Sequence, residues 1–100
     1  MTEQEMQDMI DRVADRFEQA SNTTVTPLAR KALLIPALPH MEEVSRDLQT
    51  KKISVQFLES SLQRVLENAL TVMRERDVRS IDDHSVQQSI ARNCPYLFWC

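Results

Sequence analysis

The stretch SVQFLESSLQRVLENALTVMRER, residues 54–76, carries the clearest helical pattern in the chain. Its apolar residues recur three and four positions apart, which places them on one face of a helix. They are Leu58, Leu62, Val65, Leu66, Ala69, Leu70 and Met73. Ser54 is a good N-cap because its hydroxyl can accept a bond from the first turn. We therefore predict a helix over about 55–76 and place it at the centre of the fold.

Shorter helices are predicted on both sides of this stretch. Thr2 and Glu5 have the spacing of a capping box, so a helix should begin at about residue 3. Thr26 and Pro27 read as N-cap and first helical position, and Pro36 should end that helix because the residue before a proline disfavours helical backbone. The flanking helices are expected over about 3–20, 27–34 and 40–50, and from Ser80 or Asp82 to about 92.

The composition agrees with an all-α chain. The 100 residues include no glycine, which hairpins and phosphate-binding loops usually require, whereas helices can end on Asn, Lys or Pro. No internal repeat or domain boundary is seen in the sequence. We predict a single compact all-α domain over residues 1–100, a bundle of four to five helices with a docked aromatic C-terminal tail.

Charge and hydropathy exclude several classes of protein. The formal net charge is −3 and no basic block is longer than two residues, which argues against a binder of nucleic-acid phosphates. No run of about 18 apolar residues exists, so no membrane span is predicted. Residues 1–20 hold six acids and two bases, and we expect this helix to face a basic surface of its own domain or of a partner. A cytoplasmic location is the simplest expectation.

Two polar clusters are candidates for reactive sites. Asp82, Asp83, His84 and Ser85 bring an acid, a base and a hydroxyl together, but adjacent helix positions point in different directions, so a capping cluster is expected. Asp8, Asp11, Asp15 and Glu18 recur at helical spacing, and we expect a solvated face with pairs such as Asp8–Arg12 and Asp11–Arg16 rather than a metal site. No catalytic constellation is found, and neither enzymatic activity nor a cofactor is predicted.

The cysteines do not fit common zinc modules. Cys94 and Cys100 with His40 and His84 would make four ligands, but chelating pairs normally sit two to four residues apart. Both thiols are kept as candidate reactive thiols. The residues between them, Tyr96, Leu97, Phe98 and Trp99, form an apolar cluster that we expect to pack on the domain or to contact a partner.

Two stretches resemble a known small helical domain. TPLARKALLIP (Thr26–Pro36) and MRERDVRSIDDHSV (Met73–Val86) are similar to the domain at the carboxyl end of the light-independent protochlorophyllide reductase B subunit, which also occurs alone. This resemblance implies an accessory role beside a larger redox enzyme. The stretch from Ile53 to Ile90 also resembles the long helix, loop and short helix of a histone fold, which implies a DNA-associated protein.

The function expected from the sequence is that of a small, non-catalytic interaction or accessory protein. It would act through helix and tail surfaces, with a protein partner or a second copy of itself. The two alternatives are an accessory domain of a tetrapyrrole-biosynthesis or other redox complex, and a histone-fold-like DNA-associated protein.

Overall fold

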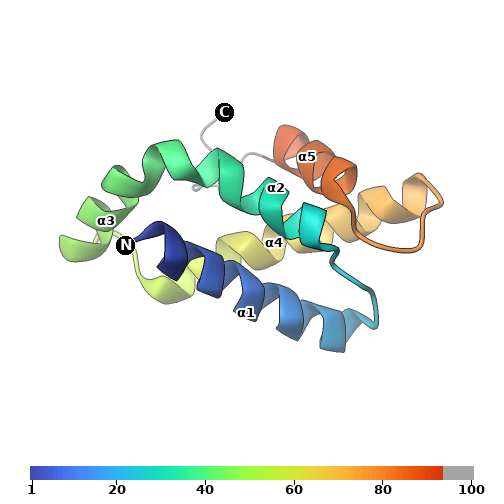
Figure 1. The fold of residues 1–100 in the computed structure, drawn as a ribbon, viewed down its shortest axis with the longest axis horizontal. Coiled ribbons are helices and arrows are strands. Elements are labelled where there is room, and N and C mark those ends of the chain that lie inside the picture. The colour runs from blue at the N-terminus through green and yellow to red at the C-terminus, as the bar shows by residue number, and fades with distance from the viewer. Residues whose placement is uncertain (94–100) are drawn as a thin grey trace.

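The computed structural model describes residues 1–93, which form five α-helices and one short 3-10 helix (Figure 1). In chain order they are α1 (Glu3–Ser21), α2 (Pro27–Ala37), η1 (Leu38–His40), α3 (Met41–Gln49), α4 (Val55–Glu75) and α5 (Asp83–Arg92). The all-α bundle with a long helix from residue 55 is thereby confirmed. The predicted docking of the tail concerns residues 94–100, which lie outside the described range.

The helix ends use side chains and left-handed residues in place of glycine. Four of the α-helices are capped by a side-chain oxygen that accepts from the backbone N–H three residues later, and these caps are Thr2, Thr26, Ser54 and Asp82. Positive φ angles of 52°, 63° and 57° occur at Asn22, Lys51 and Asp77. Each lies just after a helix, where a residue in the left-handed conformation allows backbone N–H groups to donate to the last free carbonyls of that helix.

The stop predicted for α2 was placed too early. The helix runs through Pro36 to Ala37, and η1 and α3 follow it without an extended residue between them. Pro36 lies in the last turn, so its missing N–H removes only one helical bond there. The next turn tightens instead of breaking, because the N–H of Leu38 reaches the carbonyls of both Leu34 and Ile35.

One hydrophobic core joins all the α-helices. α4 packs against α1 and α5, and α2 packs against the same two helices. Met6 and Ile10 of α1 and Leu62 and Leu66 of α4 are completely buried in it. Val44 is the buried residue that attaches α3.

Helices α1 and α4 bury a similar pattern of positions. The buried residues of α1 are Met6, Met9, Ile10, Val13, Ala14 and Phe17. Adding 56 to these numbers gives Leu62, Val65, Leu66, Ala69, Leu70 and Met73, all buried in α4 except Leu70, which is partly buried. None of these pairs is identical in sequence, which explains why no repeat is visible there.

The loop between α1 and α2 and the loop between α4 and α5 are related by the same offset of 56 positions. Val25 and Ile81 form a parallel β-bridge, in which the Ile81 N–H donates to the Thr24 carbonyl (2.9 Å) and the Thr26 N–H donates to the Ile81 carbonyl (3.1 Å). The residue after each bridge, Thr26 or Asp82, then caps the following helix. The domain is therefore built from two similar helix–loop–helix halves, residues 1–37 and 54–93, connected by η1 and α3.

Candidate functional site

The site residues predicted from the sequence lie outside the residues that the structure describes. Tyr96, Leu97, Phe98 and Trp99, with Cys94 and Cys100, fall outside residues 1–93. Within residues 1–93 no group of three or more His, Cys, Asp or Glu side chains is arranged to hold a metal ion. None of the helices described here combines the length and the apolar content needed to cross a bilayer.

The cluster at the start of α5 is a cap, as expected. One Asp82 carboxylate oxygen accepts from the Ser85 N–H (2.8 Å) and from the Arg76 guanidinium (2.7 Å), which also donates to the Ser85 hydroxyl (3.1 Å). Burial alone would raise the pKa of Asp82, but the hydrogen bonds from Ser85 and the positive charge of Arg76 outweigh it and lower that pKa. His84 is exposed and takes no part in this network.

The acidic row on α1 is met by one arginine of its own domain. Arg30 of α2 pairs with Asp11 (3.2 Å), Asp15 (2.9 Å) and Glu18 (3.0 Å). Burial lowers the pKa of Arg30, yet the bonds to Asp15 and Asp11 more than compensate and raise it. The predicted pairs Asp8–Arg12 and Asp11–Arg16 were both wrong. Asp8 accepts from the side-chain amide of Gln4 (2.9 Å), and Arg16 reaches Glu59 of α4 (2.8 Å). The contacts of Arg30 and Arg16 hold α1 to its neighbours, which is a structural role.

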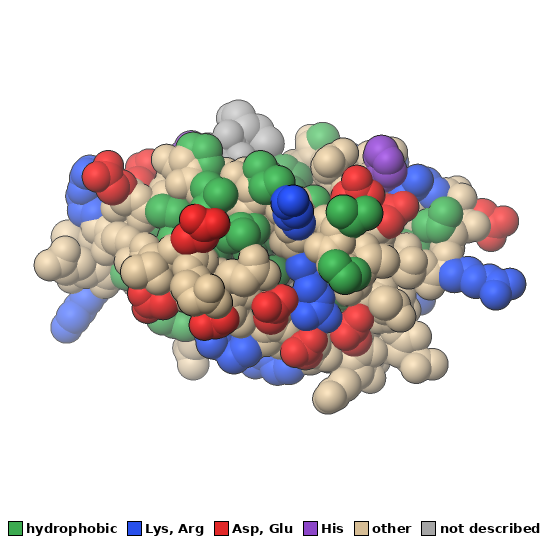
Figure 2. All heavy atoms as spheres, viewed as in Figure 1, with side chains coloured by type: hydrophobic (Ala, Val, Ile, Leu, Met, Phe, Trp, Pro, Cys, Tyr) green, Lys and Arg blue, Asp and Glu red, His purple; other side chains and the backbone are tan. Residues whose placement is uncertain are grey.

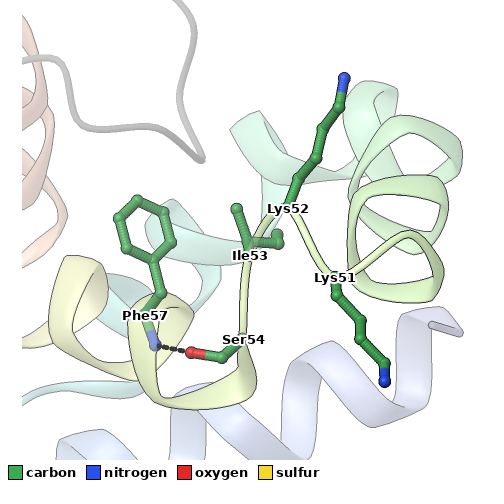
Figure 3. A pocket seen from close by; sticks show the side chains of 5 residues that line it. All are labelled: Lys51, Lys52, Ile53, Ser54 and Phe57. Carbon is green, nitrogen blue, oxygen red and sulfur yellow. Dashed lines mark hydrogen bonds between the residues drawn. The ribbon is translucent and has the colours of Figure 1, made fainter.

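A depression of about 500 Å³ lies at the start of α4 (Figure 3). Lys51, Lys52, Ile53, Ser54 and Phe57 line it, and the Ser54 hydroxyl is occupied in capping the Phe57 N–H (3.1 Å). Phe57 and Ile53 point to the same side, whereas the two lysine side chains extend away from each other (Figure 3). Because its two ammonium groups do not converge, this depression lacks the geometry of an anion-binding site.

A second depression, of about 160 Å³, lies between α2 and α5. Its lining residues are Leu28, Lys31, Ala32, Ile35, Asp83 and Gln87. Leu28 and Ile35 are the most exposed large apolar side chains of the described chain, at 61% and 53%. They are seven positions apart, so both lie on the same side of α2. Figure 2 shows hydrophobic side chains gathered along this helix among charged ones.

The equivalent positions of α5 carry no large apolar side chains. The position of α5 equivalent to Leu28 is His84, and the one equivalent to Ile35 is Ala91. Both are exposed, as Leu28 and Ile35 are, but they are polar or small. One half of the domain thus does without large apolar groups at the positions where the other half exposes two. We take the outer face of α2, defined by Leu28, Lys31 and Ile35, as the candidate site.

Sequence reasoning missed this face. α2 is apolar on nearly every side, since Leu28, Ala29, Ala32, Leu33, Leu34 and Ile35 all fall within two turns, and periodicity cannot tell which of them face outward. Comparisons of the chain with family models, with curated proteins and with solved structures found no match.

Proposed function

We propose that this chain is a non-catalytic interaction or accessory domain that acts in the cytoplasm and binds a protein partner through the outer face of α2. The observation that carries the proposal is the exposure of Leu28 and Ile35 where the equivalent helix has His84 and Ala91. Large apolar side chains held on a rigid helix and surrounded by polar residues are typical of protein interfaces.

The composition of the face supports a protein partner over a small molecule. The depression between α2 and α5 is shallow and small, about 160 Å³, whereas sites for small ligands usually enclose several hundred cubic ångströms. Lys31 and Asp83 at its edges supply polar groups of the kind found at an interface rim.

A photo-crosslinking experiment tests the proposal. A photoreactive benzoylphenylalanine is placed at position 35 of the full chain and, as the matched control, at position 91 of the equivalent helix. We expect a protein adduct from position 35 alone, and the captured protein, once purified, should bind the native chain and lose at least tenfold in affinity for the Leu28→Gln/Ile35→Gln variant. Equal yields at both positions, or unchanged affinity of that variant, would refute the proposal.

The accessory-domain alternative is tested in the same experiment. The stretch that resembles the small reductase domain, Thr26–Pro36, coincides with the helix that exposes Leu28 and Ile35. A subunit of a redox enzyme among the captured proteins would support this alternative.

The tail residues Tyr96, Leu97, Phe98 and Trp99 are a second proposed contact, on sequence grounds alone. A crosslinker at position 98 tests this contact separately.

A further inference from the structure

We infer that the occupant of the outer face of α2 is a second copy of this chain, seated through an antiparallel contact between the two α2 helices. This inference rests on the proposed function, because it uses the same face. Two features of the face carry it: the small residue between its apolar side chains, and the charges of opposite sign at its edges.

The spacing of Leu28 and Ile35 is compatible with a two-fold contact. A two-fold axis passing between residues 31 and 32 would place the exposed Leu28 of each copy against the exposed Ile35 of the other. In an isologous interface every contact between two different residues occurs twice, once on each side of the axis. Two apolar residues seven apart on each helix also suit the packing of antiparallel helices side by side.

Ala32 lies at the centre of the face and lines the depression between α2 and α5. Its side chain is 9% exposed, so it does not rise above the helix surface as Leu28 and Ile35 do. A small residue at the axis allows two helices to approach closely, so that the larger side chains on either side can interlock.

The charged residues at the edges complete the match. Lys31 and Asp83 line the same depression, one from each helix, yet neither forms an ion pair within residues 1–93. The two-fold contact brings Lys31 of one copy toward Asp83 of the other, and the same pair forms a second time by symmetry. Without Asp83 the two lysines near the axis would repel each other.

The extent of the face predicts a weak dimer. Only two large apolar side chains per copy are exposed on it, whereas stable dimers bury about 800 Å² on each partner. Association should therefore appear at high micromolar concentration and reverse on dilution.

Sedimentation equilibrium of the full chain, from about 10 µM to about 1 mM, tests the inference because this range brackets weak interfaces. We expect a reversible shift from monomer to dimer mass. Leu28→Gln/Ile35→Gln should weaken the dimer at least tenfold, whereas the control His84→Gln/Ala91→Gln on α5 should leave it unchanged. Circular dichroism confirms that each variant keeps its helices.

A charge exchange identifies the contact. Lys31→Asp and Asp83→Lys should each weaken the dimer several-fold, and the double exchange should recover most of the loss, because the pair is restored across the axis. A monomer at every concentration would overturn this inference, as would failure of the double exchange to recover. In that case crosslinking of another protein at position 35 would still support the proposed function, so the two failures are distinguishable.

Discussion

At the scale of single residues, the helix boundaries are decided by side chains that satisfy backbone groups. Asp82 is the best example, because one carboxylate oxygen both caps α5 and binds Arg76 at the end of α4. The residue therefore fixes the loop between the two helices as well as the start of α5.

Replacing Asp82 with alanine should destabilise the domain. The change removes the cap from the Ser85 N–H and leaves Arg76 without its carboxylate, and losing an N-cap alone costs about 1 to 2 kcal/mol. Asp82→Asn keeps a capping oxygen and should cost less. Urea denaturation at neutral pH measures the difference, and equal stability of the alanine variant and the native chain would contradict the assigned role.

The same pair of variants gives a prediction for pH dependence. The pKa of Asp82 is lowered in the folded chain, so its charge stabilises the fold above the unfolded-state value of about 4, and this contribution is lost as the pH falls through the folded-state pKa. The native chain should thus exceed Asp82→Asn in stability at pH 7, and the gap should close below about pH 4. A gap that stays constant with pH would show that the charge contributes nothing.

Arg30→Met should lower stability by about 1 to 2 kcal/mol. The arginine side chain is 18% exposed and separates Asp11, Asp15 and Glu18, so removing its charge leaves three carboxylates facing each other. The magnitude is kept small because the acids are partly exposed to water. Arg16→Met is the control: its pair with Glu59 is 65% exposed on the arginine side and should be worth less than about 1 kcal/mol.

The sequence predicted the caps but not the ion pairs. Thr2, Thr26 and Ser54 were assigned correctly, because a cap depends on residues three apart in the chain. For the last helix the sequence left Ser80 and Asp82 open, and the structure has Asp82 as the cap. Arg30 reaches acids that are 12 to 19 residues away, and that distance is set by how α1 and α2 cross. The spacing of residues within one helix cannot predict such a contact between two helices.

At the scale of elements, α5 is fitted to α4 by two small polar residues. Ser85 and Ser89 are both completely buried, and the Ser89 hydroxyl donates to the Val65 carbonyl of α4 (2.7 Å). The equivalent residues of α2 are Ala29 and Leu33, so the second half of the domain has the smaller side chain at the later position. α5 and α4 can therefore approach closely.

Ser89→Leu should destabilise the domain by about 2 to 4 kcal/mol. The leucine adds volume to a filled space, which costs about 1 to 3 kcal/mol, and it leaves the Val65 carbonyl without its donor from α5. Ser89→Ala removes only the hydrogen bond and should cost about 1 kcal/mol. Thermal unfolding of the two variants separates the terms, and a leucine variant as stable as the alanine variant would disprove the tight fit.

Most elements were predictable because their apolar residues recur at helical spacing, as on α1 and α4. The boundary of α2 was not, since Pro36 is tolerated within its last turn. The bridge between Val25 and Ile81 was not either, because one residue on each side leaves no alternation to detect. The outer face of α2 had the same problem: Leu28 and Ile35 look like core residues until the packing is known.

At the scale of the whole molecule, the domain consists of two helix–loop–helix halves that pack against each other. The contacts of α1 with α4 and of α2 with α5 join the halves, whereas those of α1 with α2 and of α4 with α5 lie within them. Neither half can bury its apolar surface alone, because the core residues of α1 and α4 face each other. The connection through η1 and α3 adds one buried residue, Val44.

This organisation predicts that the chain can be cut between its halves and still assemble. Fragments 1–53 and 54–100 should each be largely unfolded alone, since each exposes a face that the other covers, and mixing them should restore the helical signal of the intact domain with a one-to-one mass. Circular dichroism and native mass spectrometry follow the recovery.

The hydrophobic pairing across the cut supplies the matched control. Ile10→Asp in the first fragment places a charge where the side chain is fully buried, and it should abolish recovery. Leu28→Gln in the same fragment changes an exposed residue and should leave recovery intact. Fragments that fold separately would show that neither half needs the other, and fragments that fail to combine when mixed would show that the core does not form without the covalent connection between residues 53 and 54.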